Sequence, residues 1–371
     1  MRMEKTKEAT RDYPSFSRTP WTLWETLYAR RSHRKYLPYN LSADLEGALR
    51  EALHLALVAR GAGEGSLIAV TDPRLVAEFR RRAHKGAPNK INLWLTRAPI
   101  LGFLALAVPG EDAKAERPRE LPHAAMAAQD VVLWLTERGL GTCWLGGVNQ
   151  EEVRKVLGLS RDRVVPAAVS FGKPKPRVKA PDFDHLVYRT ISRHRKPLPS
   201  VARLQSMDVP YAPPDWEGVS LSVSPIQDVE GLLREVPRRK ESDGDAPLEP
   251  ALEACLEAAR IAPSAANAQR WCFVAVTEEQ KLVELAAACD VDAAWRAAVV
   301  GMGKPGGWEA TFFEKPFFML DLPIAFSHLS LMAASLGLAV DVRLDGFDEG
   351  RVSNLVKNAG DYRVAGVMGI R

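Results

Sequence analysis

One unit of sequence occurs twice in this chain of 371 residues, in the same order each time. Residues 52–71 and 258–277 align without a gap at a shift of 206, and both segments close with Ala-Val-Thr. Further along, Gly-Leu-Gly at 139–141 matches Gly-Leu-Ala at 337–339 at a shift of 198. Self-similarity at a fixed spacing is the sequence signature of a repeated structural unit. The sequence therefore predicts a pseudo-dimer within one chain; the alternative is chance similarity between two Ala-rich helical segments.

The same kinds of element are expected in both copies. Leu45, Leu49, Leu53 and Leu57 recur every fourth residue, which marks an amphipathic helix, and Ser42 is its expected N-cap. Other helices are expected over 21–29, 124–138, 248–259 and 323–336, and strands over 66–70, 98–108, 164–172, 271–276 and 363–369. We predict an α+β fold of two tandem copies, each a mixed β-sheet covered by helices.

Domain boundaries follow from the repeat and from composition. We expect an N-terminal extension over 1–20, a first lobe over 21–173, a linker over 174–225 and a second lobe over 226–371. The linker is rich in Pro, Lys and Arg and has no long apolar period, so it is expected to cross the surface. With 46% hydrophobic and 26% charged residues, the chain is neither disordered nor collagenous. Its net charge of +4 gives no reason to expect nucleic-acid binding.

Cysteine usage and apolar runs bear on location. The four cysteines are Cys143, Cys255, Cys272 and Cys289. They are too widely spaced for a zinc knuckle and too sparse for a disulfide framework, which is typical of a protein in a reducing compartment. The N-terminus lacks the apolar core of a secretory signal, and the apolar run over 98–108 is too short to span a membrane. We expect a cytoplasmic protein without a metal site.

The first segment with chemical potential is Arg30-Arg31-Ser32-His33-Arg34, at the end of a predicted helix. Guanidinium groups beside a hydroxyl suit a phosphate, because the planar fork donates two parallel charge-assisted hydrogen bonds. In an extended chain Ser32 and Arg34 face the same side. The alternative is a solvated basic helix end.

Two further segments combine small residues with polar groups. Ala262-Pro-Ser-Ala-Ala-Asn-Ala-Gln-Arg-Trp271 lies between a helix and a strand, where small side chains allow close approach of a flat ligand. Gly139-Leu-Gly-Thr-Cys-Trp-Leu-Gly-Gly147 has four glycines and leaves backbone N–H groups open. The alternatives are an ordinary helix-ending loop and a tight helix-to-strand turn. The glycine spacing does not fit a dinucleotide fingerprint.

Taken in order, the three segments resemble the motifs of the nitroreductase family of FMN-dependent flavoproteins, with Arg270 at a position where the family has Pro. The segment Asp321-Leu-Pro-Ile-Ala-Phe-Ser-His328 further resembles the two-lobed, single-chain members. The resemblance implies a homodimer-like architecture in which the Arg-rich and Gly-rich segments of one half meet the Pro-Ser loop of the other.

The resemblance also implies that one flavin site survives. The first copy keeps the Arg-rich and Gly-rich segments but has no Pro, Ser or Asn over 57–63; the second keeps the loop but has Asp341 and Asp345 in its Gly-rich segment, which would put negative charge near a flavin. We therefore expect one composite FMN site per chain. The cofactor-binding residues it implies are Arg30, Arg31, Ser32, Arg34, Leu145, Gly146, Gly147, Pro263, Ser264, Asn267, Gln269 and Arg177, with Lys173 and Lys179 as alternatives to Arg177 for the phosphate.

The activity implied by the resemblance is a ping-pong transfer of a hydride from NADH or NADPH through FMN to a nitroaromatic or quinone-like acceptor. The cofactor carries this chemistry, so no catalytic side chain is assigned. The alternatives are a flavin-binding protein that stores or senses FMN, another flavin-linked reaction on the same fold, and a polyanion binder using the basic runs 80–82 and 193–196. A monomer is expected, because the pseudo-dimer already contains the family's usual interface.

Overall fold

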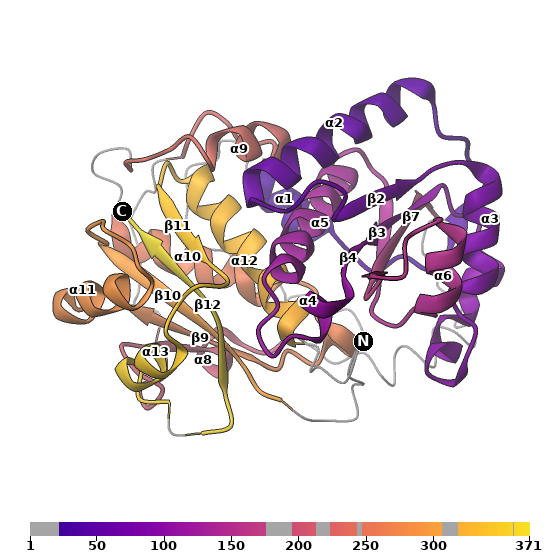
Figure 1. Cartoon of the computed structure of the whole chain (residues 1–371). Coiled ribbons are helices and arrows are strands. Elements are labelled where there is room, and N and C mark those ends of the chain that lie inside the picture. The colour runs from indigo at the N-terminus through magenta and orange to yellow at the C-terminus, as the bar shows by residue number, and fades with distance from the viewer. Residues whose placement is uncertain (1–21, 176–194, 213–222, 243–246, 306–317, 359) are drawn as a thin grey trace, which may run out of the picture.

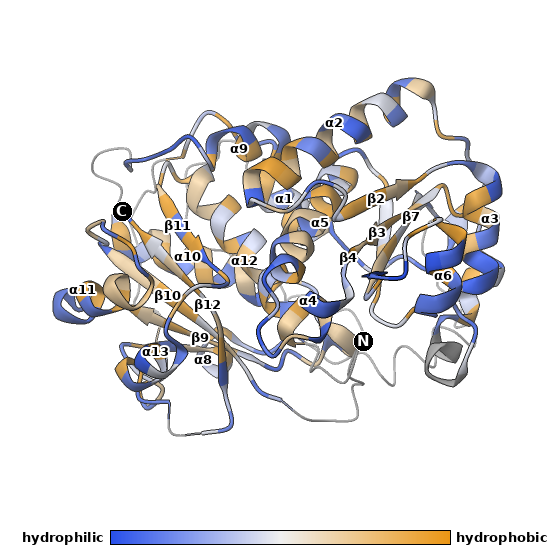
Figure 2. Ribbon diagram, viewed as in Figure 1, coloured by the Kyte–Doolittle hydropathy of each residue, from blue (hydrophilic) through white to orange (hydrophobic). Residues whose placement is uncertain are grey.

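The computed structural model describes residues 22–175, 195–212, 223–242, 247–305, 318–358 and 360–371. Two α+β lobes lie side by side, the first in indigo and magenta and the second in orange and yellow (Figure 1). Both lobes place apolar residues on the helices that face the centre of the molecule, whereas the outer helices α3 and α6 are largely hydrophilic (Figure 2).

The first lobe contains a five-stranded sheet whose path runs β1-β7-β3-β2, with β5 also paired to β7, and every described pair in it is antiparallel. Its strands are β1 (Tyr36–Leu37), β2 (Leu67–Val70), β3 (Gly102–Leu106), β5 (Gly141–Leu145) and β7 (Ala168–Pro174), and β4 (Val108–Pro109) and β6 (Arg163–Val164) form a separate pair. Its helices are α1 (Thr22–Ala29), α2 (Ala43–Arg60), α3 (Pro73–Arg82), η2 (Ala87–Thr96), α4 (Gly110–Lys114), α5 (Glu120–Glu137) and α6 (Gln150–Val156).

The second lobe repeats this plan, with a sheet in the order β11-β12-β10-β9-β8. Its strands are β8 (Ala202–Leu204), β9 (Trp271–Val276), β10 (Ala297–Gly303), β11 (Val340–Arg343) and β12 (Arg363–Ile370). Its helices are α8 (Leu198–Val201), α9 (Val229–Glu235), α10 (Leu248–Arg260), η3 (Ala265–Asn267), α11 (Glu279–Ala288), α12 (Phe318–Ser335) and α13 (Glu349–Leu355). The order β9-β10-β12-β11 matches β2-β3-β7-β5 of the first lobe, which confirms the predicted fold class.

Local signals in the sequence explain where several elements begin and end. Ser42 caps α2 by accepting a hydrogen bond from the Leu45 N–H, as predicted. Gly139 and Gly337, which the repeat makes equivalent, follow α5 and α12 with φ of 70° and 73°. Glycine adopts this left-handed conformation without steric cost, so both copies end their central helix in the same way.

The gap-free alignment at a shift of 206 is wrong at the helix ends. α2 ends at Arg60, where Gly61 takes φ 62° and closes the helix, and α10 ends at Arg260, which corresponds to a shift of 200. The loop to the next strand therefore covers 61–66 in the first lobe and 261–270 in the second. Residues 57–60, taken from sequence as loop, belong to α2.

The two lobes meet through their central helices, α5 and α12, which pack against each other (Figure 1). At this contact the Asp130 carboxylate accepts hydrogen bonds of 2.6 and 2.9 Å from Arg60 and one of 2.7 Å from Ser327. α12 is long and apolar enough to cross a membrane, by length and composition only, but 94% of its residues over Phe318–Ser335 are buried within the protein. Its apolar character is therefore accounted for by packing in the core between the lobes.

Part of the predicted linker contributes to the second lobe. β8 pairs in parallel with β9 and is preceded by α8, whose Leu198 and Val201 are buried, so this stretch does not simply cross the surface. The stretch is too short to show a hydrophobic period in the sequence. Its hydrogen-bond partners lie in a strand about 70 residues later, which no local pattern indicates. The position of the first domain boundary stays a prediction.

Candidate functional site

The Arg-rich segment leaves α1 and runs beside the Gly-rich segment. Leu23 and Leu27 anchor α1 in the core, and the helix ends at Ala29. Ser32 then forms a parallel bridge with Thr142 of β5, and the His33 N–H donates to the Thr142 carbonyl at 2.8 Å. Two of the three segments singled out from the sequence are therefore adjacent in space.

Glycine is required where these two segments meet. A Cβ atom at Gly141 would lie 2.7 Å from the His33 ring, too close for any side chain. Beyond Gly141 the strand buries Leu145 in the core and is followed by Gly146 and Gly147, which are partly exposed. The Gly147 carbonyl accepts a 2.7 Å hydrogen bond from Asn92, which fixes the end of the segment.

The Arg30 side chain is buried at this junction and its Nε has no hydrogen-bond partner in the structure. Burial, together with the neighbouring Arg31, lowers the pKa of Arg30 to about 10. Cys143 lies near Arg30, Arg34 and Ser32; burial raises the pKa of its thiol, and these three groups oppose that shift. A buried cation with an unsatisfied donor is costly unless an anion completes it.

The third segment comes from the second lobe and is held in an unusual backbone conformation. Ala266, Asn267 and Gln269 have φ values of 47°, 51° and 50°, in the left-handed region that side chains disfavour. The loop is held by a 3.0 Å hydrogen bond from the Ala265 N–H to Asp321 and by one of 3.0 Å from the Gln269 N–H to the Ser264 hydroxyl. Non-glycine residues persist in such conformations where the surroundings fix them, which is common at ligand sites.

Gln269 is wholly buried and shapes this loop from inside. Its Oε1 accepts a 2.7 Å hydrogen bond from the Lys196 N–H, and its Nε2 donates to the Asn267 carbonyl at 3.1 Å. Pro263 is buried, whereas Ser264 and Asn267 are partly exposed. A direct contact of Gln269 with a ligand stays a prediction, but these bonds already give the residue a positioning role.

Arg195 connects the loop with the Arg-rich segment. Its Nη1 donates to the Ala262 carbonyl at 2.5 Å. Burial, followed by the nearby charges of Arg30, Arg260 and Arg31, lowers the pKa of Arg195 to about 9, and the charge of Asp321 opposes this shift. Together with the hydrogen bond from Tyr28 to Glu257 across the lobes, these contacts bring the three segments to one interface.

Sequence reasoning missed Arg195. It lies in the run 193–196, within the predicted linker 174–225, which the sequence indicated only as part of a polyanion-binding alternative. The available signal was its distance of a few residues from the apolar Leu198 and Val201, which are buried. Of the alternatives for the phosphate position, Lys173 is exposed near Tyr39, and Arg177 and Lys179 lie outside the described residues.

The family model for the nitroreductase family matches residues 27–173 and 243–370, which is most of both lobes. The chain belongs to the nitroreductase family. Family membership supports an oxidoreductase, and the match in two segments agrees with the two lobes of the structure.

Similar solved structures come from several bacteria. A solved structure from Thermotoga maritima is 16% identical, with 92% of this chain and 93% of that chain covered and a TM-score of 0.43. An FMN-dependent nitroreductase from Clostridium difficile is 21% identical over 45% of this chain and 95% of its own, with a TM-score of 0.33. A nitroreductase family protein from Clostridium novyi is 20% identical over 42% and 86%, with a TM-score of 0.34. No curated protein matches the chain at a significant level.

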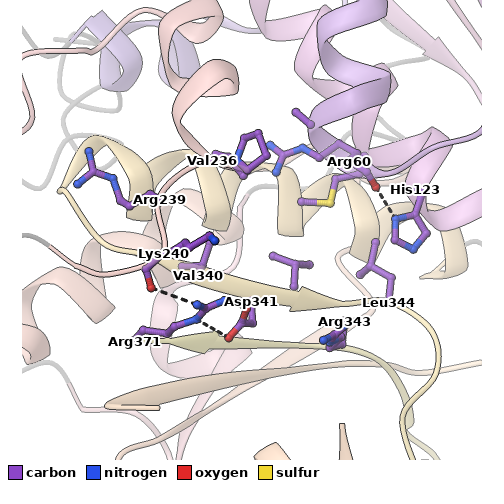
Figure 3. A pocket seen from close by; sticks show the side chains of 14 residues that line it. Arg60, His123, Val236, Arg239, Lys240, Val340, Asp341, Arg343, Leu344 and Arg371 are labelled. Carbon is purple, nitrogen blue, oxygen red and sulfur yellow. Dashed lines mark hydrogen bonds and ion pairs between the residues drawn. The ribbon is translucent and has the colours of Figure 1, made fainter. Parts of the chain in front are cut away.

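The counterparts of these segments in the second nitroreductase lobe surround a cavity of about 510 Å³ (Figure 3). We call it the Arg343 cavity; its lining is Ala59, Arg60, His123, Met126, Val236, Pro237, Arg239, Lys240, Val340, Asp341, Val342, Arg343, Leu344 and Arg371. The expectation that Asp341 and Asp345 make this place negative is wrong. Asp341 is the one acid in the lining, against five Arg and Lys residues, and Arg371 pairs with it.

Proposed function

We propose that the chain is an FMN-dependent NAD(P)H oxidoreductase with one composite flavin site between its lobes. The observation that carries this proposal is the buried Arg30, whose Nε has no hydrogen-bond partner. Two further cations, Arg31 and Arg195, lie near it. Such a cluster fits the phosphate of FMN, because a dianion would supply negative charge and hydrogen-bond acceptors to these buried cations. The donor set therefore fits the cofactor that the family resemblance implies.

The other residues fit the rest of the cofactor. Arg30, Arg31 and Ser32 would bind the phosphate, and Arg34 would reach the pyrimidine edge of the ring system. Gly146 and Gly147 would leave backbone N–H groups accessible beside the ring, with Leu145 fixed in the core beneath them. Ser264 and Asn267 would contact the cofactor from the other lobe, on a loop that Pro263 and Gln269 hold in place. When bound, FMN supplies the two-electron chemistry that transfers a hydride from NADH or NADPH to an acceptor.

Hydride transfer through a flavin needs no acid–base side chain from the protein. His328, the buried histidine nearest these cations, is held neutral, since burial first and then the charges of Arg30 and Arg195 lower its pKa to about 3. Its Nδ1 donates to the Ala258 carbonyl at 2.9 Å, so it is engaged in the core. We therefore assign binding and orientation to this chain's residues and leave the hydride chemistry to the cofactor.

The visible spectrum and flavin content of the purified protein test the proposal. We expect a yellow protein with one FMN per chain, whose bound flavin is bleached anaerobically by NADH or NADPH. A colourless protein that does not take up added FMN would overturn the proposal. Bound FMN that neither nucleotide bleaches would instead identify a storage or sensing protein.

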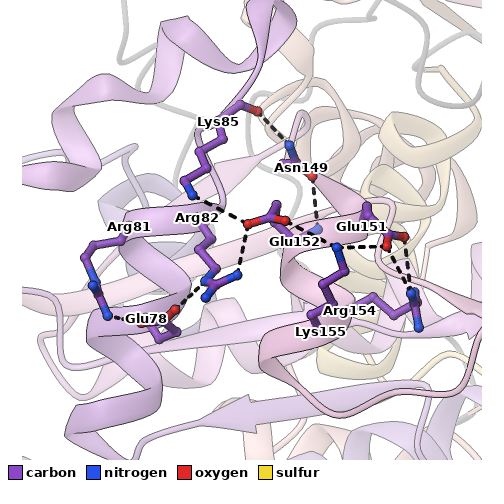
Figure 4. A network of polar contacts seen from close by, with 9 residues as sticks. All are labelled: Glu78, Arg81, Arg82, Lys85, Asn149, Glu151, Glu152, Arg154 and Lys155. Carbon is purple, nitrogen blue, oxygen red and sulfur yellow. Dashed lines mark hydrogen bonds and ion pairs between the residues drawn. The ribbon is translucent and has the colours of Figure 1, made fainter.

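The basic run at 80–82 supports this reading over a polyanion binder. Arg81 and Arg82 both pair with Glu78, and Arg82 also reaches Glu152 at 3.0 Å (Figure 4). Glu152 in turn contacts Lys85 and Lys155, so these cations join α3 to α6 in a network of ion pairs. Side chains committed to carboxylates are poorly placed to bind a nucleic-acid backbone.

A further inference from the structure

The Arg343 cavity stands in the second half of the interface at the place that the repeat makes equivalent to the proposed flavin site. A shift of 198, fixed by Gly139 and Gly337, sets Asp341 opposite Cys143, Arg343 opposite Leu145 and Leu344 opposite Gly146. The end of α2 at Arg60 lines the cavity, as the end of α10 lies beside Arg195 in the first site. The duplication has therefore left a second hollow between the lobes.

The lining differs from the first site in a way that disfavours a flavin. Leu344 is buried in the core cluster where the first site has the partly exposed Gly146. The Ser242 hydroxyl accepts a 3.0 Å hydrogen bond from the Ala339 N–H and also donates to the Arg371 carbonyl, which closes the segment around the start of β11. A flat ring system lying against glycine backbone is not accommodated by these residues.

The cations of the cavity are only partly neutralised. Arg60 pairs with Asp130, Arg239 with Glu235, and Arg371 with Asp341. Burial opposes ionisation of Asp341, but hydrogen bonds from Arg371 and Trp295 outweigh it and hold the pKa of the carboxyl below its usual range. Lys240 and Arg343 are exposed, and no carboxylate among the described residues forms an ion pair with either of them.

We propose that the Arg343 cavity binds a small organic anion through its phosphate or carboxylate group, which the positive charges of Lys240 and Arg343 attract. The cavity volume of about 510 Å³ lies in the range of small-molecule sites, and its apolar side, with Val236, Val340 and Val342, would cover the rest of the ligand. Figure 3 shows Lys240 and Arg371 toward one side of the hollow and Arg343, Leu344 and His123 toward the other. This site is separate from the flavin site and does not depend on it.

The test uses protein saturated with FMN, so that the first phosphate position is filled, and inorganic phosphate and acetate as probes. We expect at least one of the two anions to bind with a stoichiometry of one per chain by calorimetry. The double variant Lys240→Ala/Arg343→Ala should weaken this binding at least tenfold. The matched control Arg74→Ala/Lys114→Ala removes two exposed cations of the first lobe that do not line the cavity, and it should leave anion binding unchanged.

The outcomes separate this proposal from the proposed function. A response to phosphate alone identifies a phosphorylated ligand, and an equal response to acetate identifies a carboxylate. Binding that is the same in wild type and in the Lys240→Ala/Arg343→Ala variant, or absent for both anions, overturns the proposal, as does a content of two FMN per chain. If no FMN binds at all, the proposed function fails, while the difference in anion uptake between wild type and this variant still decides the present proposal.

Discussion

Gln129 Nε2 on α5 lies 2.9 Å from His328 Nε2 on α12, and the next residue, Asp130, accepts a hydrogen bond from Ser327. The shift of 198 between the copies sets Gln129 opposite Ser327 and Asp130 opposite His328. The contacts are thus reciprocal: Gln129 contacts the counterpart of Asp130, and Asp130 contacts the counterpart of Gln129. This is the pattern of a twofold interface between identical subunits, here kept within one chain after the side chains have diverged.

The neutral state of His328 predicts a pH dependence of stability. Its Nδ1 donates to Ala258, so Nε2 accepts from Gln129, whose Oε1 accepts from Trp144 at 2.9 Å. In the unfolded chain the pKa returns to the usual 6.5, whereas in the folded protein it is about 3. The unfolded state therefore binds an extra proton below pH 6.5, and the free energy of unfolding should fall by up to about 1.4 kcal/mol per pH unit as the pH drops through this window.

Urea denaturation of wild type and His328→Gln at about pH 7 and about pH 5 measures this effect. The variant lacks the titrating group, so its free energy of unfolding should change less between the two pH values, with a slope smaller by up to about 1.4 kcal/mol per pH unit. Equal slopes in the two proteins would contradict the assignment of His328 as a neutral residue.

Periodicity and capping were sufficient to predict much of the fold. The Leu45 to Leu57 spacing located α2, Ser42 caps it as predicted, and the Trp271–Val276 run is β9 as predicted. These features depend on local chain physics: one apolar face, a β-branched and aromatic run, and a side chain that accepts from the first turn. The family resemblance then supplied what local physics does not contain, namely that the motifs of two lobes meet.

Tertiary contacts account for what the sequence did not show. The extra length of the loop 261–270 was hidden because a gap-free alignment matched the strands and ignored Gly61, a helix-ending signal that was available. β8 and Arg195 depend on partners about 70 residues away, Ala275 and Ala262, and no short window of sequence contains them. The positive charge of the Arg343 cavity was likewise not expected, because Arg371, at the far end of the chain, neutralises Asp341.

The buried ion pair between Arg60 and Asp130 predicts a large asymmetry among variants. Asp130→Asn leaves the Arg60 guanidinium buried without its bidentate partner and should cost about 3–5 kcal/mol in the free energy of unfolding. The double variant Arg60→Met/Asp130→Leu removes both charges and should recover most of that loss. Ser327→Ala, which removes one hydrogen bond to Asp130, should cost about 1 kcal/mol. A double variant no more stable than Asp130→Asn by denaturant titration would refute the argument.

Arg195 should affect cofactor retention although it lies outside the matched family segments. Arg195→Ala removes a cation from the cluster and the hydrogen bond to Ala262 that holds the second-lobe loop. We expect the dissociation rate of FMN to rise about tenfold or more, as the loss of one charge-assisted contact implies. The control Arg234→Ala removes an exposed arginine of α9 that pairs with Glu230, and its FMN dissociation should equal that of wild type.

Arg30 should contribute to flavin binding at the expense of stability in the cofactor-free protein. Its buried Nε has no partner, so Arg30→Met should keep or raise the free energy of unfolding without FMN, while weakening FMN binding by at least a hundredfold. Arg238, its exposed counterpart in the second lobe, provides the comparison: Arg238→Met should change neither quantity. Denaturant titration of the flavin-free proteins and fluorescence titration with FMN measure the two effects separately. A variant that loses stability and affinity together would show that Arg30 supports the fold, and loss of FMN binding in Arg238→Met would place the flavin in the other half of the interface.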